Sequence, residues 1–251
     1  MSPGKVTVAQ LRQMKGRQKI AALTAYDFAM AQLLDACGVP LLLVGDSLGM
    51  VVLGHPDTTH VTMEEMLHHV RAAARAKPNA LLVADLPFRS YETPAQAVAN
   101  AMRFVEAGAE AVKAEGGRAI LESVRGIIAA GIPFLGHLGM LPQQVLEEGG
   151  YHIKGKVDDE HAALLADAAA LCDAGAFAIV LELVTPPVAR ELTQRVSVPT
   201  IGIGSGPDCD GQILVTTDLL GTSPGRIPKH AKPANLAEAI RTTVTAWKAA
   251  L

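Results

Sequence analysis

The sequence predicts a single parallel (β/α)8 barrel, and three observations lead to this fold class. Eight short apolar runs recur along the 251 residues, and helical stretches separate most of them. The runs are apolar throughout rather than alternating, which is typical of parallel strands covered on both faces. Chains of this length often form one such barrel. A doubly wound open sheet is the competing architecture.

Capping residues mark the ends and starts of the expected helices, and the expected strands lie between them. Helices end before several strands at a glycine, as at Gly38 and Gly175, because glycine tolerates the left-handed conformation that closes a helix. Helix starts are marked by a capping box from Thr62 to Glu65 and by Pro94 at a first helical position. The expected strands are Ile20–Thr24, Leu41–Gly45, Ala80–Asp85, Ala111–Glu115, Pro133–Leu138, Phe177–Glu182, Thr200–Ile203 and Gln212–Thr216.

Two connections depart from a regular barrel. Residues 45–62 form a long glycine-containing connection, and long loops in compact domains are often functional. The segment between the seventh and eighth strands has hardly any room for a helix. We expect residues 1–17 to be a short extra N-terminal segment and residues 234–251 to be a closing helix. No low-complexity linker divides the chain, so residues 1–251 are expected to form one domain.

Composition and charge exclude several classes of protein. Hydrophobic residues make up 49% of the chain and charged residues 19%, which provides a large core and excludes disorder. A net charge of −3 gives no general attraction to nucleic acid or to an anionic membrane. The longest apolar run, Val39–Gly45, is far shorter than the roughly 18 residues of a membrane span. We therefore expect neither nucleic acid nor a membrane as a partner.

The three cysteines of the chain indicate its cellular compartment. Their number is odd and no CxxC spacing occurs, which argues against a disulfide framework and against a thiolate zinc site. The first residues also lack the apolar segment of a secretory signal. These features predict a cytoplasmic protein.

Four of the expected strands end at or next to a carboxylate. One such residue alone is more often a turn former or a helix cap. In a barrel, however, all four side chains meet at one rim, where the active sites of this fold lie. Like charges concentrated there need a counter-charge, and oxygen ligands without cysteine favour a hard cation such as Mg²⁺. The four residues are Asp46, Asp85, Glu115 and Glu182.

Two basic side chains are expected at the same rim. Lys113 lies two residues before Glu115, so both share one face of a strand, and its ammonium is placed to hold a substrate carboxylate. His137 ends the fifth strand and is expected to line the substrate pocket, although a structural role is as common for a lone histidine.

Two further motifs carry weak signals. The glycine-rich run 202–206 follows a strand but lacks the spacing and the lysine of nucleotide-binding loops, so close packing at the rim is the preferred interpretation. A short basic segment follows near the C-terminus and is suited to an anionic cosubstrate rather than to nucleic acid. Its basic residues are Arg226, Lys229, His230 and Lys232.

The combination of motifs is more specific than any one of them. In order, the chain contains VGDSLGM, LLVADLPFRSY, VKAEGG, GHLGMLPQ, VLELV and GIGSGPDCDGQILV. Together they resemble the ketopantoate hydroxymethyltransferase family over residues 22–232. The resemblance implies a barrel of the phosphoenolpyruvate/pyruvate superfamily, with 3-methyl-2-oxobutanoate as substrate and 5,10-methylenetetrahydrofolate as one-carbon donor. It also implies one Mg²⁺ per subunit and a homodecamer of two pentameric rings.

The resemblance also implies roles for individual residues. Asp46 and Asp85 match the Mg²⁺ ligands of the family, and Glu115 matches a third metal-associated carboxylate. Ser47 and Lys113 match its ketoacid contacts. Glu182 matches the general base that removes the C3 proton and generates an enolate.

The chain departs from the family pattern at several positions. None of these departures removes a proposed catalytic group, but they bear on the lid and on the folate contacts. They are Ala114, Leu141, Gln144, Leu146 and Thr217.

Two other functions compete with this hypothesis. The first is another metal-dependent carbon–carbon lyase of the same superfamily that acts on a 2-oxoacid. The second is a barrel that binds a ketoacid without turnover, because a fold does not determine a function.

Overall fold

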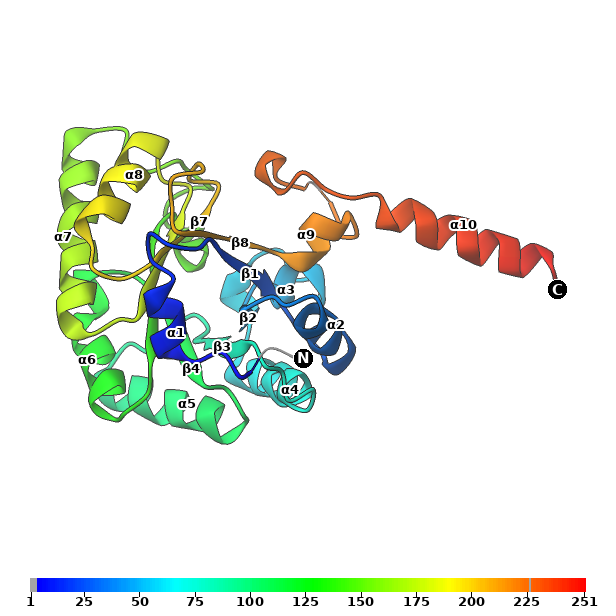
Figure 1. The fold of residues 1–251 in the computed structure, drawn as a ribbon, viewed down its shortest axis with the longest axis horizontal. Helices are drawn as coiled ribbons and strands as arrows, with labels where there is room; N and C mark the ends of the chain where they lie inside the picture. Colours follow the sequence, from blue (N-terminus) through cyan, green and yellow to red (C-terminus); the bar gives the residue numbers. More distant parts are fainter. Residues whose placement is uncertain (1–3, 226) are drawn as a thin grey trace.

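Eight parallel strands close into a barrel in which each strand pairs with its sequence neighbour and β1 pairs with β8 (Figure 1). The computed structural model describes residues 4–225 and 227–251, so residues 1–3 and Arg226 of the basic segment lie outside the described residues. The strands are β1 (Ile20–Thr24), β2 (Leu41–Val44), β3 (Leu81–Asp85), β4 (Ala111–Glu115), β5 (Phe134–Gly139), β6 (Ala178–Glu182), β7 (Thr200–Ile203) and β8 (Gly211–Leu214).

The predicted fold class is confirmed, and all eight expected strands are present. The largest shift concerns β8, which was expected to run to Thr216 but ends at Leu214. Thr216 instead begins a helix, because its backbone N–H and its hydroxyl hydrogen-bond to the side chain and carbonyl of Thr24. These bonds turn the chain out of the sheet at the carboxyl end of the barrel.

Helices follow most of the strands and cover the outside of the barrel. The chain between β7 and β8 is a loop without a helix, as its length predicts. The helices are α1 (Val8–Gln13), α2 (Phe28–Ala36), α3 (Leu48–Val51), α4 (Met63–Ala74), α5 (Pro94–Glu106), α6 (Leu121–Ala129), α7 (Asp158–Ala174), α8 (Pro186–Arg195), α9 (Thr216–Leu220) and α10 (Leu236–Ala249), with 3₁₀ turns η1 (Thr58–His60), η2 (Arg118–Ile120), η3 (Pro142–Gln144) and η4 (Lys229–Ala231).

The core has two layers, as expected for strands that are apolar on both faces. The outer layer lies between the strands and the helices and includes Phe104 and Phe134. The inner layer fills the barrel itself with side chains such as Leu81 and Phe177. Leu11 of α1 belongs to this inner layer, so the extra N-terminal segment packs against the barrel interior.

The C-terminal helix α10 differs from the other long helices. It has no buried residue, and it leads away from the barrel (Figure 1). Its exposed apolar side chains recur at helical spacing and therefore share one face. They are Leu236, Ile240, Val244 and Trp247. None of the described helices is long and apolar enough to cross a membrane.

Candidate active site

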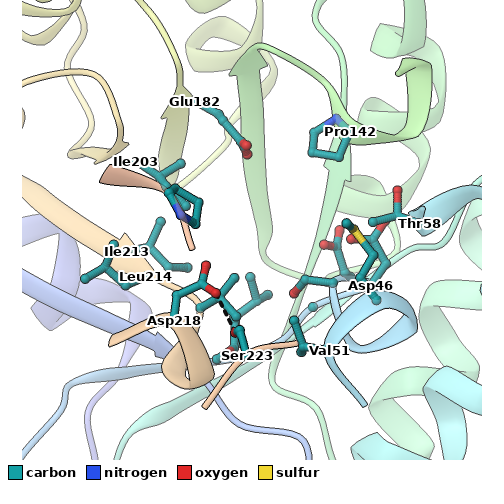
Figure 2. A pocket seen from close by; sticks show the side chains of 18 of the residues that line it. Asp46, Val51, Thr58, Pro142, Glu182, Ile203, Ile213, Leu214, Asp218 and Ser223 are labelled. Atoms are coloured by element: carbon teal, nitrogen blue, oxygen red, sulfur yellow. Dashed lines mark hydrogen bonds between the residues drawn. The ribbon is translucent and has the colours of Figure 1, made fainter. Parts of the chain in front are cut away.

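The residues singled out at the strand ends line one cavity of about 680 Å³ at the carboxyl end of the barrel (Figure 2). Asp46 and Ser47 follow β2, and the other five residues lie in the C-terminal parts of β3 to β6, so parallel strands bring all of them together as predicted. All seven expected site residues line this cavity: Asp46, Ser47, Asp85, Lys113, Glu115, His137 and Glu182.

Lys113 is the counter-charge within the acidic group. Its Nζ donates a 2.6 Å hydrogen bond to Asp85 Oδ2 and lies 4.0 Å from Glu115 Oε1. Burial lowers the pKa of this lysine, but the charges of Asp85 and Glu115 outweigh it and raise the pKa above its usual value. Lys113 therefore carries a positive charge, although only 4% of the residue is exposed.

One lysine does not balance three buried carboxylates. Burial raises the pKa of Asp46 well above its usual value, and repulsion from Asp85 and Glu115 adds to the effect. Burial also raises the pKa of Asp85, despite its bond to Lys113. The side of the cavity formed by β2 to β4 thus carries less positive than negative charge, and a bound cation would correct this imbalance.

The donor atoms present suit a hard divalent cation. Asp85 Oδ1 and Glu115 Oε1 are buried and have no hydrogen-bond partner among the described residues. Within the same residues, no three His, Cys, Asp or Glu side chains converge on a complete metal cage. Mg²⁺ fits this arrangement, because it commonly uses one or two carboxylates and takes its other ligands from water and substrate.

His137 lies between two carboxylates. Its Nδ1 is 3.5 Å from Glu115 Oε1 and its Nε2 is 3.3 Å from Glu182 Oε2, without the alignment of a hydrogen bond. Burial and a nearby lysine charge lower the pKa of His137, but the two carboxylates outweigh both effects and raise that pKa to about 9. His137 therefore links the acidic group to Glu182.

Glu182 projects into the open part of the cavity (Figure 2). Its side chain is 17% exposed, in contrast to the buried carboxylates of β3 and β4. Gly139 lets β5 approach the backbone of Glu182 closely, because a Cβ at Gly139 would lie 2.1 Å from the Glu182 carbonyl oxygen. A glycine is required there by this contact and by its φ of +99°.

Gln143 is a site residue that the sequence did not reveal. Its Nε2 donates to Asp46 Oδ2 at 2.8 Å, and its backbone N–H donates to Glu115 Oε2 at 3.0 Å. Its Oε1 accepts a 2.6 Å hydrogen bond from the hydroxyl of Tyr91. The only sequence signal was a glutamine after a proline in the loop that follows β5, which does not distinguish a buried amide from an exposed one.

Tyr26 is a second residue of this kind. Its hydroxyl lies 2.8 Å from Ser47 Oγ, so it holds the side chain of an expected ketoacid contact. His69 Nδ1 in turn lies 2.6 Å from the Tyr26 carbonyl oxygen. Tyr26 lies in the short connection between β1 and α2. β1 contains no charged residue that would mark a site, and nothing in the sequence pairs Tyr26 with Ser47.

The glycine-rich run 202–206 acts through close packing. A Cβ at Gly204 would lie 2.6 Å from Leu183 and 3.1 Å from His230. The preferred interpretation of this run is therefore confirmed. The contact also brings His230 of the basic segment to the rim of the cavity.

The departures from the family pattern lie mostly outside the acidic group. Ala114 is buried in the outer core layer, between the sheet and the helices, so its side chain does not face the cavity. Gln144 and Leu146 are exposed in and after η3.

Comparison with known proteins decides the family. A family model described as ketopantoate hydroxymethyltransferase matches residues 5–251. The chain belongs to the ketopantoate hydroxymethyltransferase family. It is 54% identical over 239 residues to the 3-methyl-2-oxobutanoate hydroxymethyltransferase of Moorella thermoacetica, covering 94% of this chain and 89% of that one. The enzyme of the same name from Ignicoccus hospitalis is 51% identical over 238 residues, covering 94% and 90%. The predicted family and enzyme class are thus confirmed.

Solved structures of more distant proteins share the fold of this family member. A phosphonomutase homologue from Burkholderia cenocepacia superimposes with a TM-score of 0.68 at 15% identity, covering 97% of this chain and 98% of that one. A 2,3-dimethylmalate lyase of the PEP mutase/isocitrate lyase superfamily gives a TM-score of 0.63 at 17% identity, covering 98% and 87%. Both matches show the predicted barrel fold.

Proposed function

We propose that the protein transfers a hydroxymethyl group from 5,10-methylenetetrahydrofolate to 3-methyl-2-oxobutanoate. The product is 2-dehydropantoate (ketopantoate), which leads to pantothenate and coenzyme A. The observation that carries the proposal is that Glu182 shares one cavity with the buried group of Asp46, Asp85 and Glu115. A base beside an oxygen-rich cation site is what removal of a proton next to a carbonyl requires.

The acidic group would hold one Mg²⁺ per subunit. Asp46 and Asp85 are its proposed direct ligands, and Glu115 the third associated carboxylate. The orphaned oxygens of Asp85 and Glu115 support this assignment. When bound, Mg²⁺ supplies a Lewis acid next to the keto oxygen and stabilises the negative charge that develops there.

Ser47 and Lys113 would orient the ketoacid. The Ser47 hydroxyl, held by Tyr26, donates to the substrate carboxylate from one side of the cavity. The Lys113 ammonium attracts the same anionic end while it remains bonded to Asp85. The carboxylates around it favour the protonated ammonium over the free amine that a Schiff base requires, so Lys113 is assigned to orientation by position and charge.

Glu182 would act as the general base. Its carboxylate is partly exposed to the cavity and removes the proton from C3 of the ketoacid. His137, which lies beside it, keeps the carboxylate in position and lines the substrate pocket. The C3 carbon then bonds to the methylene carbon of the donor, and a water oxygen supplies its hydroxyl group. The two C–N bonds of the methylene carbon break, and the folate nitrogens take up the C3 proton from Glu182 and one proton from the water, so tetrahydrofolate leaves.

We also propose that the protein is a homo-oligomer, with the family's decamer as its expected form. The uncovered apolar face of α10 supports association with other copies of the chain, because exposed apolar patches mark interaction surfaces. A cytoplasmic location completes the proposal, and it is supported by three free cysteines, Cys37, Cys172 and Cys209.

Incubation with both substrates and Mg²⁺ tests the proposal. Ketopantoate, detected by mass spectrometry, should appear only when the ketoacid, the folate donor and Mg²⁺ are all present. Turnover of other 2-oxoacid substrates without the donor would instead favour a carbon–carbon lyase. Ketoacid binding with no product under any condition would favour a binding protein.

A further inference from the structure

Half of the cavity lies away from the acidic group. Its wall there comes from β7, β8 and the segment after them, with the apolar side chains of Ile203, Ile213 and Leu214 (Figure 2). The volume of about 680 Å³ falls within the range of roughly 300–1,000 Å³ that is typical of sites for drug-sized ligands. A five-carbon ketoacid held at Ser47 and Lys113 would leave this half of the cavity free for the second substrate.

Asp218 is the acidic side chain on that wall. It lies on α9, which begins directly after β8, and its carboxylate points into the cavity from the side opposite Asp46 (Figure 2). Ser223 Oγ donates a 2.5 Å hydrogen bond to Asp218 Oδ1 and lies 2.7 Å from Thr217 Oγ1. This hydrogen bond holds the carboxylate in place, so it is preorganised to accept further hydrogen bonds from a ligand.

The charge of Asp218 selects the kind of ligand. A carboxylate repels the anionic end of the ketoacid, so it suits a group that presents N–H donors. The pyrimidinone edge of a reduced pterin carries such donors side by side, a ring N–H and an exocyclic amine, and these match the two oxygens of one carboxylate. The flat ring beside this edge suits the apolar wall.

The position of the methylene carbon in the donor agrees with this placement of the pyrimidinone edge. The methylene group of the donor sits at the end of the pteridine opposite the pyrimidinone edge. The methylene carbon must reach C3 of the ketoacid near Glu182, so the pyrimidinone edge must point toward the far wall.

We propose that Asp218, supported by Ser223, binds the pyrimidinone edge of the tetrahydrofolate cosubstrate and fixes the methylene carbon toward the ketoacid. This inference rests on the proposed function, since it names the subsite for its donor. Asp218 is therefore a binding residue for the second substrate, separate from the ketoacid half of the site.

Calorimetric titration of the Mg²⁺-loaded protein with tetrahydrofolate tests the subsite. The nearly isosteric Asp218→Asn should bind tetrahydrofolate at least about 10-fold more weakly, since a charge-assisted pair is lost. Asp173→Asn, the same exchange on the exposed end of α7, should stay within about twofold of wild type. Unchanged affinity in the Asp218→Asn protein overturns the subsite.

A ligand lacking the exocyclic amine provides a second test. Wild type should bind 2-desamino-tetrahydrofolate about 10-fold more weakly than tetrahydrofolate, whereas Asp218→Asn should discriminate little between the two. Equal discrimination by both proteins overturns the pairing of this carboxylate with the amine.

Separate outcomes distinguish a failure of the proposed function from a failure of the Asp218 subsite. Wild-type protein that forms no ketopantoate overturns that function, whatever the titrations give. Asp218→Asn protein that forms ketopantoate with an unchanged KM for the donor overturns the subsite alone. Deuterium exchange at C3 of the ketoacid, which does not use the donor, reports whether the other half of the site is intact.

Discussion

Gln143 Nε2 donates a 2.8 Å hydrogen bond to Asp46 Oδ2, which joins the loop after β5 to the carboxylate that follows β2. The backbone N–H of the same residue holds Glu115. One buried amide therefore sets the positions of two carboxylates from different strands. Residues that orient metal ligands in this way usually tune metal affinity.

We predict that Gln143→Leu weakens metal binding. The substitution leaves Asp46 without its amide donor, and the affinity for Mn²⁺ should fall by about 10- to 100-fold. Electron paramagnetic resonance titration with Mn²⁺ measures this without turnover. Gln144→Leu is the matched control, because Gln144 is the next residue and is exposed. Equal Mn²⁺ affinity in the two variants would contradict the role of Gln143.

Lys113 should form no covalent adduct with substrate. The acidic side chains around it raise its pKa, so its amine stays protonated and cannot attack a carbonyl. After treatment with 3-methyl-2-oxobutanoate and borohydride, the intact mass should equal that of protein treated with borohydride alone. A mass increase that maps to the peptide containing Lys113 would refute the orienting role.

The sequence predicted the strand bounds, which depend on local patterns, and the convergence of side chains at the carboxyl ends of parallel strands. β1, β4 and β7 have the expected bounds, and the strand-end carboxylates converge as expected. Contacts between distant loops were not predictable in this way. The bond from Gln143 to Asp46 joins residues 97 positions apart, and no local pattern encodes such a pairing. The same holds for Thr24, whose bonds to Thr216 shorten β8.

Asp210 should stabilise the attachment of the N-terminal segment. Its carboxylate accepts hydrogen bonds from Lys15 Nζ and the Gly16 N–H, and also from the Thr200 N–H. Asp210→Asn should lower the free energy of unfolding near neutral pH by about 1.5–3 kcal/mol. Urea denaturation measures the change, with Asp173→Asn as an exposed control.

The effect at Asp210 should depend on pH in a defined direction. Burial raises the pKa of Asp210, but the hydrogen bonds from Thr200 and Lys15 outweigh it and lower the pKa below its usual value. The stabilisation is therefore complete above the ordinary pKa of an aspartate and is lost as the pH falls through the lowered value. Wild type and Asp210→Asn should converge in stability in acid. A constant difference down to low pH would contradict this account.

The apolar face of α10 should mediate self-association. Trp247→Asp places a charge among Ile240 and Val244, so sedimentation velocity should show smaller species than wild type. Thr242→Asp is the control, because this residue lies on the opposite face of the helix. Identical sedimentation of both variants and wild type would show that this face does not hold the oligomer together.

Removal of the C3 proton by Glu182 is the central claim, and proton NMR of 3-methyl-2-oxobutanoate in D₂O with Mg²⁺ tests it most directly. Wild type should exchange the C3 proton, and ketopantoate should appear once 5,10-methylenetetrahydrofolate is added. Glu182→Gln should bind Mn²⁺ as wild type does, yet exchange the proton at least about 100-fold more slowly, within the usual range for loss of a general base. Exchange at the wild-type rate in Glu182→Gln would contradict the account.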